Sequence, residues 1–112
     1  MIVDAGKKKV GDLLIGNFTF IAVGDGGDDT STSQSVLDNE VSRKPATVNR
    51  VGNTLIYDVT FTGADLISNI VNELGIFNAS SGGEMLSRVN FNTIGPLSTS
   101  ESVSFTFRLE VE

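Results

Sequence analysis

The stretch ESVSFTFRLEVE, residues 101–112, has the strictest alternation of apolar and polar side chains in this sequence. Successive side chains of a β-strand point to opposite faces of a sheet, so a repeat of two residues predicts a strand with one buried face. The stretch therefore predicts a strand that directs an apolar stripe into a core between two sheets. The members of the stripe are Val103, Phe105, Phe107, Leu109 and Val111.

Five further segments carry strand patterns, because they are rich in β-branched and aromatic residues and stop at turn-forming residues. They span residues 17–23, 46–51, 54–63, 70–79 and 84–94. Gly52 and Asn53, between the second and third of these segments, favour a tight hairpin turn. The fourth segment is expected to bulge at Gly75 and to form another hairpin with the fifth.

Two helical elements are expected beside the strands. Residues 3–15 predict a short amphipathic helix docked on another element, because their apolar residues recur at helical spacing. Those residues are Val3, Val10, Leu13 and Leu14. Further along, Ser33 or Ser35 is expected to cap a short helical turn that carries Val36 and Leu37.

These elements predict a mainly all-β fold, an antiparallel β-sandwich of about six strands with a short N-terminal helix and one short helical turn. A chain of 112 residues and 11.9 kDa is expected to form a single domain, residues 1–112. Within it, residues 1–16 form the N-terminal helical segment and residues 24–35 form an exposed acidic loop.

The charge balance excludes some classes of partner. The net charge is −6 and the pI is about 4.4, which argues against nucleic acid, because binding phosphates requires clustered Lys and Arg. The short basic run KKK, residues 7–9, is interpreted as a solvated helix face. No apolar run approaches the ~20 residues that span a bilayer, and no signal peptide is recognised, so synthesis in the cytosol without a membrane partner is expected.

The side chains of most catalytic and metal centres are missing. The sequence has no His and no Cys, which removes the usual general base, the commonest zinc ligands and disulfides. We therefore expect no enzymatic activity and no cofactor. A small domain without disulfides or a structural metal often gains stability by association with other chains, so oligomerisation is expected.

Asp25, Asp28 and Asp29 are the only weak candidates for metal ligands. They lie in GDGGDD, residues 24–29, where an EF-hand that starts at Asp25 would require glycine at Thr30 and glutamate at Val36. The glycine spacing of dinucleotide- and phosphate-binding loops is also absent. Solvated acids in an exposed loop are the favoured interpretation, and a calcium site of another type stays open.

Glu73 interrupts the apolar run of residues 70–79. A carboxylate buried there costs free energy unless it is paired or hydrogen-bonded. Arg43, Arg50 and Arg88 are its candidate partners, and an exposed position on one strand face is an equally acceptable alternative.

Four segments together resemble a known family. They are AVGDG (residues 22–26), LDNEVSR (residues 37–43), NELGIFN (residues 72–78) and, after the turn at Gly82 and Gly83, MLSR (residues 85–88). In this order and spacing they resemble the N-terminal domains of tail-fibre (tail-collar) proteins of tailed bacteriophages and related small virion proteins. In that family the second segment ends a short helix.

The resemblance implies a structural virion protein without catalytic residues, an adaptor in the tail, baseplate or fibre attachment region that assembles with copies of itself and with other virion proteins. A trimer is the favoured homo-oligomer. The chain has NFNTIGPLSTSES where the family usually has P-x-x-[YF]-K-P, and it has no long shaft after residue 112, which favours the small stand-alone virion proteins. The residues expected at assembly interfaces are Val10, Leu13, Leu14, Asp25, Asp28, Asp29, Glu73, Arg43 and Arg88.

Two alternatives are kept. The first is a capsid decoration or turret protein on the head of the particle, although a place in the tail or baseplate of the virion is favoured. The second belongs to another class, a calcium- or carbohydrate-binding β-sandwich module whose ligand loop would be GDGGDDTSTS, residues 24–33.

Overall fold

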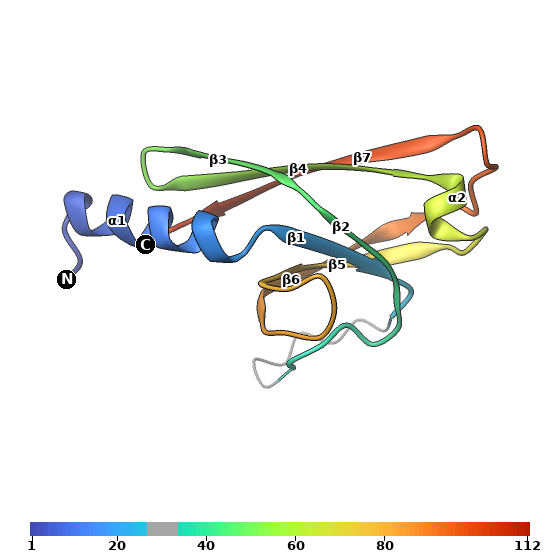
Figure 1. Ribbon diagram of the computed structural model, residues 1–112, viewed down its shortest axis with the longest axis horizontal. Helices are drawn as coiled ribbons and strands as arrows, with labels where there is room; N and C mark the ends of the chain where they lie inside the picture. The colour runs from blue at the N-terminus through green and yellow to red at the C-terminus, as the bar shows by residue number, and fades with distance from the viewer. Residues whose placement is uncertain (27–33) are drawn as a thin grey trace.

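The computed structural model describes residues 1–26 and 34–112. Two antiparallel sheets pack on each other, and a helix extends from one end of the sandwich (Figure 1). One sheet has the strand order β2-β1-β5-β6 and the other has the order β3-β4-β7. The elements are α1 (Asp4–Asn17), β1 (Phe20–Gly24), β2 (Glu40–Pro45), β3 (Thr47–Val51), β4 (Thr54–Thr62), α2 (Gly63–Leu66), β5 (Val71–Phe77), β6 (Met85–Ile94) and β7 (Ser102–Glu110).

The predicted fold class is confirmed, an all-β sandwich with a short N-terminal helix and one short helical turn. The described part of the chain has one strand more than the six expected, because residues 40–45 form β2. After Pro45 the chain crosses at Ala46 from one sheet to the other and continues as β3, as Figure 1 shows. The crossing chain closes this side of the sandwich, and the amide of Ala46 donates to the carbonyl of Thr19 at 2.8 Å.

The hairpin predicted around Gly52 and Asn53 is confirmed. β3 and β4 pair in antiparallel register, with Val51 opposite Thr54, so two residues form the turn. Gly52 has a φ of +64°, a left-handed conformation that a residue with a side chain rarely adopts. The turn therefore fixes the register that directs the alternate residues of β4 inward.

The second predicted hairpin, β5 with β6, is also present, but the bulge is not at Gly75. The register between these strands shifts between Val71 and Glu73 and again between Ile76 and Phe77, while Gly75 pairs regularly on both sides. A β-carbon at Gly75 would lie 3.1 Å from side-chain atoms of Leu37 and of Met85. Glycine is needed there because another segment packs closely on the sheet, not because the strand bulges.

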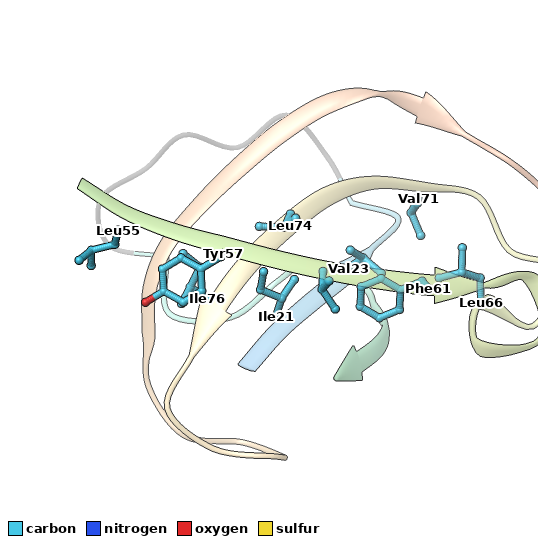
Figure 2. Close-up of a cluster of buried hydrophobic side chains, with 10 residues drawn as sticks. Ile21, Val23, Leu55, Tyr57, Phe61, Leu66, Val71, Leu74 and Ile76 are labelled. Atoms are coloured by element: carbon cyan, nitrogen blue, oxygen red, sulfur yellow. The ribbon is translucent and has the colours of Figure 1, made fainter. Parts of the chain in front are cut away.

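The core lies between the inner faces of the two sheets (Figure 2). On β4 every second residue is buried; these are Leu55, Tyr57, Val59 and Phe61. They face Ile21 and Val23 of β1 and Leu74 and Ile76 of β5. The apolar stripe of β7 packs against this core, but its side chains are only half-buried, so the sequence overestimated their burial.

The N-terminal helix is present as α1, but Val3, Val10 and Leu13, three of the four apolar residues expected on its docked face, are exposed. Its contact with the sandwich is close at Gly11, where a β-carbon would lie 2.9 Å from Cδ of Arg50. Leu14 and Ile15 pack against the core, and Asp12 forms an ion pair with Arg50. The helix is therefore fastened through one narrow face to the β3–β4 hairpin.

The short helical turn is not where the sequence placed it. Residues 34–39 contain no helix, and Ser33, one of its two expected caps, lies outside the described residues. The turn is α2, which follows β4 directly. Thr62 and Asp65 form a capping box at its start, in which each side chain accepts a hydrogen bond from the backbone amide of the other.

Candidate functional site

Glu73 is the one charged side chain in the described residues that is completely buried. It stands on the outer face of the β2-β1-β5-β6 sheet, on the same side of β5 as Gly75 and Phe77. Its carboxylate accepts hydrogen bonds from the backbone amides of Asp38 at 3.2 Å and Asn39 at 3.1 Å. Nη2 of Arg88 lies 2.9 Å from Oε1 of Glu73 and supplies the opposite charge.

Arg88 belongs to β6 and is itself nearly buried, with its side chain 8% exposed. It also donates to Oδ1 of Asn90 and lies 3.7 Å from a carboxylate oxygen of Asp38. Of the three arginines proposed as partners of Glu73, Arg88 is therefore the one that binds it. Arg50 instead pairs with Asp12.

The same carboxylate lies against the chain just before residue 27. A β-carbon at Gly26 would collide with both oxygens of Glu73. The side-chain amide of Asn72 pairs with the backbone of Gly26 in both directions, accepting from its N–H at 2.9 Å and donating to its carbonyl at 3.0 Å. Asp25 then donates from its backbone N–H to the carbonyl of Asn39 at 3.0 Å. We call this arrangement the Glu73 clasp.

Arg43 forms a second fastening on the same face of the sheet. Its guanidinium donates to the carbonyls of Ala79 at 2.9 Å and Gly82 at 2.8 Å, in the β5–β6 turn, and forms a salt bridge with Glu40. The guanidinium carbon lies 3.8 Å from the ring centre of Phe77. Charge, hydrogen bonds and ring contact together hold the turn against β2.

A small apolar cluster fills the space between the two fastenings. Leu37 packs against Ala22 and Phe77, with Phe20 and Met85 at the border. Residues 34–39 therefore cover the outer face of the sheet, and the sheet is buried on both sides at its centre. Glu73, Arg43 and Arg88 were expected at an assembly interface, but they lie inside this layer and hold it together.

The chemistry of the Glu73 clasp is that of a structural joint. The carboxylate is occupied by an arginine and two backbone amides, and it has no exposed surface with which to contact a ligand. Its partners come from residues 38–39, which follow the acidic loop, and from β6, while Gly26 at the start of the loop lies against it. The clasp therefore fixes where that loop leaves and re-enters the sheet.

The acidic loop itself is described only at its ends. Asp25 stands beside the Glu73 clasp, while Asp28 and Asp29 lie outside the described residues. Within residues 1–26 and 34–112 no group of three His, Cys, Asp or Glu side chains is placed to hold a metal ion. The described residues therefore provide no set of ligands for the calcium alternative.

A groove runs along the side of the sandwich opposite the β2–β3 crossing, between β6 and β7. It has a volume of about 500 Å³. Phe91 of β6 and Phe105 of β7 both line it and pack on each other with their rings tilted and the ring centres 5.2 Å apart. No charged residue lines it; its lining is Leu74, Val89, Phe91, Asn92, Thr93, Ile94, Phe105, Thr106 and Phe107.

The groove is bordered by two edge strands. β6 pairs only with β5, and β7 pairs only with β4, among the strands that the structure describes. The backbone donors and acceptors on their other sides therefore face outward along the groove. Their inward side chains are half-buried instead of buried, which explains why the stripe of β7 is less enclosed than its alternation predicts.

α1 carries the second exposed apolar feature. Val10 is 37% exposed and Leu13 is 60% exposed. With Val3 they follow a spacing of seven and three residues, which places them on one face of the helix. Leu14 is turned toward the core and is half-buried. Of the expected contact residues Val10, Leu13 and Leu14, the first two are therefore exposed at the surface.

Among the described residues three groups have perturbed pKa values, and none of the three lines the groove. Burial raises the pKa of Tyr57 to about 12, and its hydroxyl donates to the carbonyl of Phe18 at 2.9 Å. Hydrogen bonds from the backbone of Thr62 and from Lys44 lower the pKa of Asp65. The pKa of Glu101 is lowered by the backbone amide of Ser98. All three shifts follow from core packing or turn capping.

Comparisons with known proteins add no family to this description. Neither the family models nor the curated proteins include a match to this chain. In the described part of the chain no helix has the length and apolar character needed to cross a membrane.

The groove was missed at the sequence level, although its residues carry a signal. Val89 and Phe91 alternate with polar neighbours, as the inward face of a strand does. A period of two reports that a face is apolar but not whether another strand covers the edge. The pairing order of the strands, which depends on long-range contacts, decides that β6 and β7 both end at the same side.

Proposed function

We propose that this chain is a structural protein of a tailed-virus particle, an adaptor in the tail, baseplate or fibre attachment region that works by assembly with copies of itself and with neighbouring virion proteins. The observation that carries the proposal is the open apolar side of the sandwich. A groove without charged residues, bordered by two edge strands, is a surface suited to burial against another protein chain.

The positions of the four family-like segments support the same proposal. AVGDG ends β1, LDNEVSR leads into β2, NELGIFN forms β5 and MLSR begins β6. All four lie in one sheet, and their polar residues meet in the Glu73 clasp and the Arg43 fastening. The resemblance therefore rests on residues that contact one another, although LDNEVSR does not end a helix as the family pattern implies.

The net charge of −6 supports a protein that stays soluble until it meets its partner surface. Like-charged free subunits repel at long range. An uncharged groove is the part of the surface where that repulsion is weakest. A structural protein that must remain dispersed before assembly benefits from this combination.

Light scattering on the purified full chain, with and without EDTA, tests the proposal. An assembly protein should have the mass of an oligomer, and EDTA should leave that mass unchanged. A monomer at all concentrations that gains thermal stability from calcium or a sugar would contradict the proposal and favour the binding-module alternative. Neighbouring genes for tail proteins, as opposed to capsid proteins, would distinguish the tail position from decoration of the head.

A further inference from the structure

The open side of the sandwich has fewer of the features that protect its opposite side. On that opposite side, β2 carries Glu40, Arg43, Lys44 and Pro45 in six residues. Charges and proline at a sheet edge discourage pairing with another strand. β6 and β7 extend for 10 and 9 residues and contain no proline. The one charged residue of β6 is Arg88, which is held by Glu73, and β7 carries charges only near its end, at Arg108 and Glu110.

The dimensions of the open side fit a protein interface. A strand of nine or ten residues is about 30 Å long, and two packed sheets stand about 10 Å apart. Covering both strands and the groove between them would therefore bury several hundred Å² per chain. Stable specific interfaces bury about 800 Å² per partner, so this side is of the right order.

The charges favour a particular occupant. A basic partner would find no carboxylate in the lining of the groove, and an acidic partner would find no cation there. The complementary surface is another uncharged apolar one, and this chain itself has such a surface. An antiparallel strand edge is also self-complementary, because a twofold axis places it against its own copy with donors facing acceptors.

Resting on the proposed function, we infer that the open side is closed by the same side of a second copy, related by a twofold axis. In this dimer the edge of β6 or β7 pairs with its own copy, and the half-buried rings of Phe91 and Phe105 from both chains fill the joined groove. The repeating unit of assembly is then a dimer and not the trimer that the family resemblance favours.

Val89→Asp tests this arrangement. Val89 lines the groove and is 38% exposed, so a carboxylate there is tolerated by the monomer but is brought close to its twin across the axis. The control is Val51→Asp on β3. This strand is at the edge of the β3-β4-β7 sheet away from β7, and the side chain of Val51 is 66% exposed. Asn92→Lys places a charge of the opposite sign in the same groove and serves as a second variant.

Sedimentation equilibrium over a range of concentrations is the measurement, with circular dichroism to check that each variant is folded. The wild-type chain and Val51→Asp should be dimers, while Val89→Asp and Asn92→Lys should associate at least roughly tenfold more weakly. A trimer, or an oligomer that persists in both groove variants, overturns the inference and leaves the proposed assembly function standing. A wild-type chain that is a monomer at every concentration overturns both.

Discussion

Glu73 shows how a single polar residue can determine the arrangement of its surroundings. Its carboxylate is completely buried, and its partners come from residues 38–39 and from β6. Two charges in the interior are favourable only while both are present and hydrogen-bonded. The position of Glu73 on β5 therefore determines which segments pack there, because its carboxylate binds two backbone amides and Arg88.

Replacing this carboxylate should cost much more than its hydrogen bonds alone. In Glu73→Gln, Arg88 would lose its buried counterion and one amide N–H group would face a donor. We expect the free energy of unfolding to fall by about 3–5 kcal/mol, measured by urea denaturation. Glu112→Gln, at an exposed position, is the control and should change it by less than about 0.5 kcal/mol. A loss at Glu73 as small as that of the control would contradict the clasp.

Tyr57 gives a direct test of core burial, because it is the only tyrosine. Burial raises its pKa from 10.0 to about 12, so the folded state holds the phenolic proton more tightly than the unfolded state does. Stability should therefore be complete below pH 10 and should fall by roughly 2–3 kcal/mol as the pH rises to about 12. Absorbance of the phenolate should show late ionisation in the folded chain and ordinary ionisation in urea. Tyr57→Phe removes this pH-dependent part of the stability.

At the scale of elements, Gly26 joins β1 to the Glu73 clasp. A β-carbon there would overlap the carboxylate of Glu73, so Gly26→Ala must displace either the loop end or the buried ion pair. We expect a loss of about 1–3 kcal/mol in thermal or urea unfolding. The matched control is Gly16→Ala in α1, where nothing lies within 4 Å and alanine favours the helix. Equal effects of the two substitutions would show that the close approach at Gly26 is not energetically important.

The elements also show what the sequence could predict. The hairpin between β3 and β4 was predicted correctly, because the turn residues Gly52 and Asn53 specify it locally. A short helical turn was predicted at Val36 and Leu37 because Ser33 or Ser35 could cap it. In the structure the backbone amides of Asp38 and Asn39 donate to Glu73 instead, and Leu37 packs over Gly75. These contacts join residues that are about 35 positions apart in the sequence, and they outweigh the local preference for a helical turn.

The candidate site was predictable only in part. The helical spacing at the N-terminus predicted α1 but not its docked face, because Val10 and Leu13 are exposed and only Leu14 of the predicted residues packs against the core. Arg88 was one of three proposed partners of Glu73. The groove was not predicted, because strand order brings Phe91 and Phe105 together from distant segments. Whether an apolar strand face is enclosed depends on which strands are at the edge, and no local pattern contains that information.

At the scale of the whole molecule, the two sides of the sandwich differ in their exposure to other chains. One side is closed by the crossing from β2 to β3, and the other is left open between β6 and β7 (Figure 1). The chain has no disulfide and its apolar groove reaches the surface. Burial of that groove between chains would add the stability that a small sandwich otherwise lacks.

The central proposal is that this chain assembles through its open side. The most direct test is hydrogen exchange of the backbone amides, measured at low and at high protein concentration. Edge amides of β6 and β7 exchange quickly in a monomer and slowly once another chain covers them. We predict that protection rises with concentration in Met85–Ile94 and Ser102–Glu110 and stays constant in Glu40–Pro45. Protection that is independent of concentration in β6 and β7, or that rises only in α1, would contradict it.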